Sequence, residues 1–354
     1  MQQISVVLIV RNEEANLAKC INSTKGLADH VIVVDTGSDD NTVKIAAECG
    51  ARIFNFPWVD DFAAARNYAL SLSDTEWNLI LDADEYIVDV DPVAVRAFLK
   101  QSQAVGRIEI VSETADSEEI YETRNYITRL IPRGLQFKGK IHEQVDTDLP
   151  RTNVPIVVRH TGYLHRNKSN RNIPLLQDEL LMNADDPYLH YQLAKEYSGI
   201  GLYEDSKFSF ERAIDLISGN ERFAPNIIVD YLYLTIKMQD YERGLEIVNS
   251  AYACVQGFSD YFFACGVFYR DLVLSEPTEY VSLLPAIESS YLKCIELGDS
   301  LRYDGVTGTG TFAAWYNLGN YYEVLGNTDK ARNCYRRSAQ YNYARAIQRL
   351  HDIA

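Results

Sequence analysis

Two carboxylates, Asp82 and Asp84, follow a hydrophobic run at residues 77–81, and their spacing could support metal chemistry. Because strand side chains alternate between faces, a strand that ends in Asp-x-Asp sends both acids to one face. Two hard oxygen donors in that position could hold Mg²⁺ or Mn²⁺, and the ion could carry a diphosphate. The same residues are also typical of a solvated turn. The elements that precede them decide between these interpretations.

Strand and helix patterns alternate before the two acids, with short links between them. This alternation predicts a parallel sheet with helices on both faces. Ligands of such sheets bind beyond the carboxyl ends of the strands, where the sequence places Asn12, Asp35 and Asp82. Neither Gly-x-Gly-x-x-Gly nor Gly-x-x-x-x-Gly-Lys-Ser/Thr occurs, so a metal would provide another way to hold a diphosphate. The expected strands cover residues 4–10, 31–34, 51–56 and 77–81, and the expected helices cover residues 15–21, 43–49 and 62–72.

Four short segments strengthen the metal interpretation because they occur together and in order. They are Val-Arg-Asn-Glu-Glu at residues 10–14, Val-Val-Asp-Thr-Gly-Ser-Asp-Asp-Asn-Thr at residues 33–42, Phe-Ala-Ala-Ala-Arg-Asn at residues 62–67 and Leu-Asp-Ala-Asp-Glu at residues 81–85. These segments resemble the motifs of family 2 glycosyltransferases. The resemblance implies an α/β GT-A fold with a Rossmann-like, mostly parallel sheet. It also implies a UDP-sugar donor, a divalent cation (Mn²⁺ or Mg²⁺) and transfer that inverts the anomeric centre.

The resemblance also implies roles for individual residues. Asp35 matches the acid that hydrogen-bonds uracil, Asp84 the direct metal ligand, and Arg66 the basic residue near the diphosphate. Considered alone, Asn12 and Glu13 could instead cap the next helix, and Arg66 could be an exposed helix charge. The implied metal ligands are Asp84, Asp82 and His160, and the implied donor-binding residues are Val10, Asn12, Glu13, Asp35, Arg66, Asp82, Ala83, Lys168 and Arg171.

Inverting transfer needs a base that deprotonates the acceptor as it attacks the anomeric carbon. Residues 139–145, Gly-Lys-Ile-His-Glu-Gln-Val, resemble the equivalent segment of tetratricopeptide-linked relatives that glycosylate peptides or proteins. This resemblance makes Glu143 the candidate base. Glu143 could instead pair with Lys138 or Lys140, and His142 could hold the acceptor or the metal.

The segment that follows contains further candidates. His160 ends an expected strand at residues 154–160 and could be a metal ligand, as in related enzymes, or a structural histidine. Lys168 and Arg171 lie in a polar stretch that could close over the diphosphate as a lid or could be a basic linker. The acidic residues 113–122 predict a solvated loop or a sheet edge.

From Ile173 onward the apolar residues recur with helical periodicity, and strand patterns disappear. Trp315, Leu318 and Gly319, with the aromatic and alanine positions after them, match the tetratricopeptide pattern. Weaker copies precede this unit, and an insertion is expected at residues 277–285 or 305–310. We therefore expect a GT-A domain at residues 1–172 and an all-α tetratricopeptide-like domain at residues 173–354. The concave face of such an array suits a peptide or protein, although the array could instead form a homodimer or brace the first domain.

Composition narrows the class of partner and the compartment. The net charge of −16 disfavours nucleic-acid binding, which depends on neutralising phosphates. No apolar run is long enough to span a bilayer, and the first residues carry no basic secretory n-region. The six cysteines lack metal-site spacing. These features predict a reduced, cytoplasmic protein.

Two hypotheses from different classes remain open. The first is an inverting, metal-dependent glycosyltransferase that moves a sugar from a UDP-sugar to a peptide or protein side chain (Ser/Thr or Cys). Its acceptor could alternatively be a glycan precursor of lipopolysaccharide or capsule. The second hypothesis is a tetratricopeptide adaptor with a degenerate transferase domain. The joint presence of Asp35, Arg66, Asp82 and Asp84 favours the enzyme.

Overall fold

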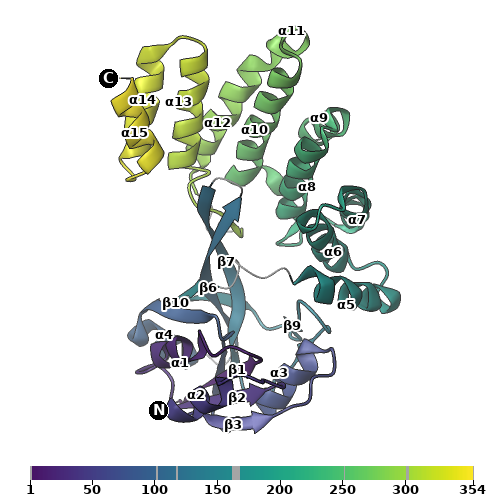
Figure 1. Cartoon of the computed structure of the whole chain (residues 1–354), viewed down its shortest axis with the longest axis vertical. Helices are drawn as coiled ribbons and strands as arrows, with labels where there is room; N and C mark the ends of the chain where they lie inside the picture. The colour runs from purple at the N-terminus through teal and green to yellow at the C-terminus, as the bar shows by residue number, and fades with distance from the viewer. Residues whose placement is uncertain are drawn as a thin grey trace. The chain divides into compact units, whose positions relative to one another are not determined.

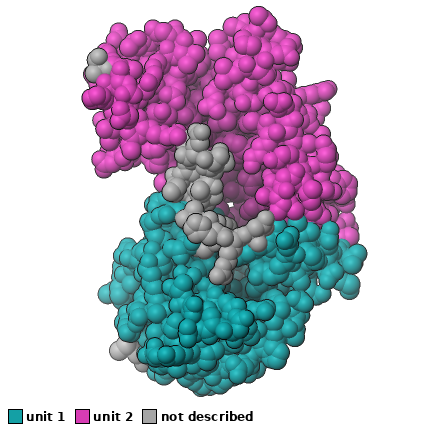
Figure 2. Space-filling view, viewed as in Figure 1, with its two compact units in different colours: residues 1–182 teal, residues 183–354 magenta. Residues whose placement is uncertain are grey.

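Figure 1 shows the computed structural model of the protein, which describes residues 2–100, 103–116, 119–161, 168–250, 252–299 and 303–353. The chain divides into two compact units, Met1–Met182 and Asn183–Ala354, shown in teal and magenta in Figure 2. The boundary expected between residues 172 and 173 falls inside helix α5 (Ser169–Met182), which belongs to the first unit.

One mixed sheet forms the centre of the first unit, in the order β3-β2-β1-β4-β7-β6-β10-β5. The pairs β3–β2, β2–β1, β1–β4 and β6–β10 are parallel, whereas β4–β7, β7–β6 and β10–β5 are antiparallel. Strands β3, β2, β1 and β4 lie in the segment for which strand–helix alternation predicted a parallel sheet, and they pair in parallel. The strands are β1 (Ile4–Val10), β2 (His30–Asp35), β3 (Arg52–Asn55), β4 (Trp77–Ile80), β5 (Glu85–Val90), β6 (Val105–Asp116), β7 (Glu119–Pro132) and β10 (Arg151–His160). A separate small sheet pairs β8 (Phe137–Lys138) with β9 (Gln144–Val145).

Side-chain alternation along β1 explains how the sheet is covered on both faces. Val6 and Leu8 lie in one apolar core with residues of α1, α2 and α4, whereas Val7 lies in a second core with residues of α3. The run is therefore apolar on both faces, as a buried parallel strand requires. The helices are α1 (Leu17–Ser23), α2 (Thr42–Glu48), α3 (Phe62–Ser71) and α4 (Pro92–Leu99).

The acidic stretch at residues 113–122 differs from the loop interpretation. Its described residues continue β6 and β7, which pair antiparallel as far as Asp116 and Glu119. The loop alternative was wrong because charge was taken as a sign of irregular structure. Antiparallel ladders accept polar side chains wherever one face meets solvent.

The second unit consists of helices packed in antiparallel pairs, as the repeat pattern predicted. The pairs are α6 with α7, α8 with α9, α10 with α12 and α13 with α14, and α15 follows. Their bounds are α6 (Pro187–Gly199), α7 (Tyr203–Leu216), α8 (Ala224–Met238), α9 (Tyr241–Asn249), α10 (Ser259–Ser275), α12 (Leu284–Leu297), α13 (Phe312–Val324), α14 (Thr328–Ala339) and α15 (Ala344–Asp352). A 3-10 turn, η2 (Ala253–Val255), precedes α10.

Glycine lets the paired helices approach closely. A Cβ atom at Gly319 of α13 would lie 2.5 Å from the ring of Tyr335 on α14, and one at Gly266 of α10 would lie 2.8 Å from Tyr291 on α12. Each glycine therefore receives the aromatic ring of its partner helix. This contact gives a physical reason for the Leu-Gly step in the repeat pattern.

Both segments expected to hold the insertion contain extra structure. Helix α11 (Pro277–Tyr280) and the 3-10 turn η3 (Val281–Leu283) lie between α10 and α12, and β11 (Gly305–Val306) lies between α12 and α13.

In the described part of the chain, every helix is too short or too polar to cross a bilayer.

Candidate active site

Asp35 ends β2 and closes the turn that follows it. Its carboxylate accepts hydrogen bonds at 3.1 Å from the backbone N–H groups of Gly37 and Ser38. Gly37 has φ +112°, a conformation that side chains disfavour, so the glycine makes the turn possible. The side chain of Asp35 is buried, with 6% of its residue surface exposed. The carboxylate is therefore fixed in direction before any ligand arrives.

Asn12 and Glu13 connect the loop after β1 to the loop after β2. The N–H of Asn12 donates to Ser38 Oγ at 2.9 Å, and the N–H of Glu13 donates to Thr42 Oγ1 at 2.7 Å. The N-cap residue of α1 is Asn16. The alternative that Asn12 and Glu13 cap this helix was therefore wrong, and the two residues instead align two strand ends.

Arg66 is buried rather than an exposed helix charge, because α3 turns it toward the strand ends. Its Nη2 donates to Asp82 Oδ1 at 2.8 Å, and its Nε donates to Glu143 Oε1. Burial disfavours the charged guanidinium, but the charges of Asp82 and Glu143 outweigh it and raise the pKa of Arg66. Arg66 thus links the strand-end acid to the candidate base.

Helix α3 also positions the loop that carries Glu143. The side-chain amide of Asn67 donates to Phe137 O at 2.9 Å and accepts from the Phe137 N–H at 2.7 Å. Lys138 forms an ion pair with Asp146 at 2.9 Å, so the alternative in which Lys138 pairs with Glu143 was wrong.

His142, the residue next to Glu143, has φ +51° and lies in the same loop. Its carbonyl oxygen accepts a hydrogen bond from Gln144 Nε2 at 3.1 Å.

Asp84 and His160 meet at the junction of β4, β5 and β10. His160 Nε2 lies 3.2 Å from Asp84 Oδ2, and Ser112 Oγ lies 3.4 Å from His160 Nδ1. Burial lowers the pKa of His160, but its hydrogen bond to the Asp84 carboxylate outweighs burial and raises that pKa. The N–H of Thr161 donates to Asp84 O at 3.1 Å and fixes the backbone of the acid.

The three expected metal ligands do not form one cluster. Asp84 and His160 face each other, whereas both carboxylate oxygens of Asp82 accept hydrogen bonds from arginines. Within the described ranges, no three His, Cys, Asp or Glu side chains are arranged to hold a metal ion. The two remaining donors, Asp84 and His160, are therefore the residues through which a cation would be held.

Sequence reasoning missed two members of this site, Arg129 and Glu85. Arg129 Nη2 donates to Asp82 Oδ2 at 2.7 Å and to Glu85 Oε1 at 3.3 Å. Glu85 Oε2 also accepts from the N–H of Asp82 at 2.9 Å. The signal for Arg129 was a charged residue inside the otherwise uncharged run at residues 126–132. Glu85 directly follows the Asp-x-Asp motif.

The surroundings of Asp82 and Glu85 shift the pKa values of these two acids in opposite directions. Burial would raise the pKa of Asp82, but the charges of Arg129 and Arg66 outweigh it and hold that pKa well below its usual range. Burial, supported by the charge of Asp82, raises the pKa of Glu85 to about 7 although Arg129 acts in the opposite direction. Asp82 is consequently a permanent anion, shared between two guanidinium groups.

Residues 5–163 match the family described as Glycosyl transferase family 2, and residues 187–220 and 312–345 each match a tetratricopeptide repeat family. The first unit is a glycosyl transferase family 2 domain. The expected fold class, an α/β catalytic domain followed by tetratricopeptide-like helices, is confirmed.

Relatives of known sequence support this assignment. A TPR repeat-containing protein of Synechococcus elongatus is 34% identical over 205 residues, which are 53% of this chain and 51% of that protein. An uncharacterized glycosyltransferase of Rickettsia felis is 44% identical over 85 residues, 24% of this chain and 30% of that protein. The SPbeta prophage-derived glycosyltransferase SunS of Bacillus subtilis is 28% identical over 198 residues, 52% of this chain and 46% of that protein. The chain spans about half or less of the length of these relatives.

Four further residues of the family 2 domain were expected to bind the donor. Val10 ends β1, Ala83 lies in the turn between β4 and β5, and both residues are buried. Lys168 is exposed. Arg171 places its guanidinium 4.9 Å from the ring centroid of Phe62 at the start of α3. The polar stretch of Lys168 and Arg171, for which a lid or a basic linker was expected, leads into and begins helix α5.

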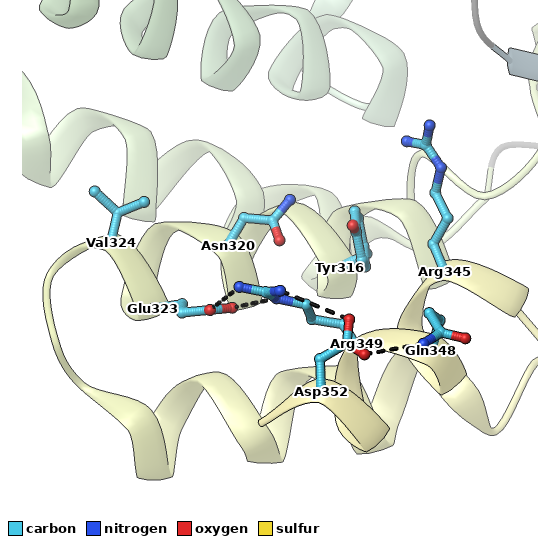
Figure 3. Close-up of a pocket in the computed structure, with 8 residues that line it drawn as sticks. All are labelled: Tyr316, Asn320, Glu323, Val324, Arg345, Gln348, Arg349 and Asp352. Atoms are coloured by element: carbon cyan, nitrogen blue, oxygen red, sulfur yellow. Dashed lines mark hydrogen bonds and ion pairs between the residues drawn. The ribbon is translucent and has the colours of Figure 1, made fainter. Parts of the chain in front are cut away.

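A second candidate site lies in the repeat unit, where α13 and α15 line an open pocket of about 570 Å³ (Figure 3). Arg349 lies between Glu323 and Asp352, and its Nε donates to Glu323 at 3.0 Å. Asn320 Oδ1 accepts from Tyr335 at 2.7 Å. The pocket is lined by Tyr316, Asn320, Glu323, Val324, Arg345, Gln348, Arg349 and Asp352.

Proposed function

We propose that the protein is an inverting, metal-dependent glycosyltransferase that moves a sugar from a UDP-sugar to a peptide or protein side chain. The family match supports glycosyl transfer. The observation that carries the proposal is the buried network at the end of β4, in which Arg66 and Arg129 hold Asp82 beside Asp84. The buried charged residues around this strand end are Arg66, Arg129, Asp84 and Glu85. A degenerate adaptor domain would have no need to bury them, because unpaired or imperfectly paired buried charges destabilise a fold.

The donor half of the proposal rests on Asp35. Its carboxylate already accepts from two backbone N–H groups and retains lone pairs for a further donor. Uracil presents a ring N–H that can donate to a carboxylate, whereas cytosine has an acceptor at the same position. We therefore assign UDP rather than CDP as the nucleotide.

The proposed metal dependence rests on the pair formed by Asp84 and His160. A carboxylate oxygen and an imidazole nitrogen that face each other at 3.2 Å are a donor set that suits Mn²⁺. When bound there, Mn²⁺ or Mg²⁺ would supply charge that stabilises the departing diphosphate. Asp82 pairs with Arg66 and Arg129, and these contacts orient the turn that carries Asp84.

The acceptor half of the proposal rests on Glu143. Inversion requires the acceptor to attack the face of the sugar opposite the diphosphate while a base removes its proton. Arg66 fixes one oxygen of Glu143, so the carboxylate has a defined direction toward an arriving acceptor. His142, adjacent in the same loop, is the second candidate for contact with the acceptor.

The repeat unit supplies the reason for proposing a polypeptide acceptor. The pocket between α13 and α15 carries groups of both charges and the Asn320 amide, a lining that suits the backbone and polar side chains of a peptide. We propose that this surface binds part of the acceptor. A glycan precursor remains the alternative ligand, and a homodimer through the repeats is the alternative use of the array.

A hydrolysis screen tests the proposed function directly. The protein is incubated with a panel of UDP-sugars and Mn²⁺, and released UDP is measured without acceptor. We expect release from one or a few UDP-sugars, with none from Asp84→Ala. If no nucleotide sugar is hydrolysed and UDP does not bind, the adaptor hypothesis replaces the enzyme.

A further inference from the structure

Arg129 reaches the candidate active site through an irregularity in strand β7. The pairing of β6 with β7 passes from Gly106↔Leu130 to Arg107↔Thr128, which leaves Arg129 as an extra residue. Such a bulge redirects the side chain of the extra residue. Arg129 and Leu130 are both buried.

The strand opposite the bulge is adapted to it. A Cβ atom at Gly106 of β6 would lie 2.9 Å from Leu130 Cβ and 2.8 Å from Val154 Cγ2. Both distances are too short for any side chain, so only glycine allows β6 to pack beside the bulged strand. The bulge in β7 and Gly106 in β6 therefore together position Arg129.

The arginine closes the turn that carries the proposed metal ligand. The N–H of Glu85 donates to Asp82 O at 3.0 Å, and the N–H of Asp82 donates to Glu85 Oε2 at 2.9 Å. Arg129 Nη2 then joins the two side chains, with distances of 2.7 Å to Asp82 and 3.3 Å to Glu85. Asp84 is the third residue of this turn, between the two residues that Arg129 connects.

We infer that Arg129, acting with Glu85, is a positioning residue that holds the turn from Asp82 to Glu85 so that Asp84 is presented to the donor's cation and diphosphate. This inference rests on the proposed function. Arg129 contacts Asp82 and Glu85 and acts through them. Both contacts come from one guanidinium nitrogen, Nη2, whose N–H directions are fixed by the planar group. A lysine at this position would keep the charge but carry it on a flexible stem without those fixed directions.

Calorimetric titration with UDP, in the presence and absence of MnCl₂, tests the inference on the full-length chain. Arg129→Met should weaken Mn²⁺-dependent UDP binding by ~10–100-fold, the usual effect of removing a group that orients a metal ligand. Arg129→Lys should fall between Arg129→Met and the wild type. Binding of UDP without Mn²⁺ should change by less than about twofold, because Asp35 lies on a different strand. General damage to the fold would weaken both kinds of binding equally, so an equal loss would overturn the inference.

Arg124 provides the matched control on the same strand. It forms an ion pair with Glu109 at 2.7 Å, and its side chain is 48% exposed. Arg124→Met should leave both kinds of binding within about twofold of wild type. If Arg129→Met does not fold, Arg129→Lys decides the question. Mn²⁺-dependent binding of the folded Arg129→Lys protein at the wild-type level would overturn the positioning role. A wild-type protein that binds no UDP at all would instead contradict the proposed function, and the inference with it.

Discussion

Asp82 in the first unit is partly buried, with 36% of its side chain exposed, and Asp260 in the second unit is buried. Their surroundings affect the negative charge in opposite ways. Asp82 accepts from two guanidinium groups, and its pKa is held well below the usual range. Asp260 accepts from neutral groups, the Thr309 hydroxyl at 2.5 Å and the Val306 N–H at 2.7 Å. Burial raises the pKa of Asp260 to about 7, and these hydrogen bonds reduce the shift without abolishing it.

Asp82 is therefore held in its charged form, whereas burial of Asp260 favours the protonated form. Burying two arginines costs desolvation energy, which is offset only if the ion-pair geometry is good and hydrogen bonds satisfy the remaining polar groups. A buried carboxyl with neutral partners can instead take up a proton and act as a hydrogen-bonding link. The first arrangement is therefore expected at a ligand site, and the second where a loop such as residues 303–311 is fixed to a helix.

The largest expected effect lies next to Asp82. Asp84→Ala should reduce sugar transfer or donor hydrolysis by at least ~10⁴-fold, because the cation and its charge stabilisation are lost together. The fold should be retained, since Asp84 loses one hydrogen bond to His160. Donor hydrolysis and circular dichroism measure the two effects, and EDTA should reproduce the loss in the wild type. Full activity in EDTA would remove the metal from the account.

The second largest effect concerns the base. Glu143→Gln keeps the shape of the side chain but removes the proton acceptor, so turnover should fall by ~10²–10⁴-fold. UDP affinity should stay close to wild type, because Glu143 is assigned no donor contact. A smaller loss that shrinks as pH rises would indicate a thiol acceptor, which ionises by itself. Undiminished turnover at pH 6 with a hydroxyl acceptor would move the role to His142.

Asp260 tests the other half of the comparison through the pH dependence of stability. Its pKa is raised from 3.8 to about 7 in the folded state. The folded protein therefore keeps a proton that the unfolded chain releases. The resulting stability is fully present below the unfolded pKa and is lost as pH rises from about 4 to about 7. The loss should be on the order of 4 kcal/mol, at about 1.4 kcal/mol for each pKa unit.

Asp260→Asn removes this titration and should flatten that part of the stability curve. The amide can still accept from Val306 and donate to Thr309, whose hydroxyl is 3.1 Å from Val306 O. Urea unfolding of the full chain at pH 5 and pH 8 measures the effect, and the exposed Asp215→Asn is the matched control. An unchanged pH slope in Asp260→Asn would show that Asp260 is ionised despite its burial.

The smallest effect concerns apolar packing in the second unit. Gly319→Ala adds a methyl group 2.5 Å from the fully buried ring of Tyr335, so unfolding free energy should fall by about 1–3 kcal/mol. Gly199, at the end of α6, has nothing within 4 Å of the same position. Gly199→Ala should therefore be neutral or stabilising by up to about 1 kcal/mol, as helix propensity predicts. Equal unfolding midpoints for the two variants would contradict the packing argument.

The sequence predicted the elements that local pattern controls. The apolar strand at Ile4–Val10, the turn after Asp35 and the repeat helix that contains Trp315 all follow from periodicity and turn chemistry, and all are present. The pairing partners of the acids could not be predicted, because they depend on contacts between distant residues. Arg129 reaches Asp82 only through a bulge, and Glu143 reaches Arg66 only through a loop that Asn67 positions. The order of motifs was enough to locate the site. Only the structure showed that Asp82 pairs with two arginines whereas Asp84 pairs with His160.

Nucleotide binding tests the central claim, that the first unit binds a UDP-sugar, most directly. Calorimetry with Mn²⁺ should show UDP binding at least ~10-fold more tightly than CDP or GDP, which is the loss expected when a hydrogen-bond donor to a charged group is missing. Asp35→Ala should bind UDP more weakly and lose this preference, whereas the exposed Asp215→Asn should retain it. Equal affinity for the three nucleotides, or an Asp35→Ala protein that still prefers UDP, would contradict the account.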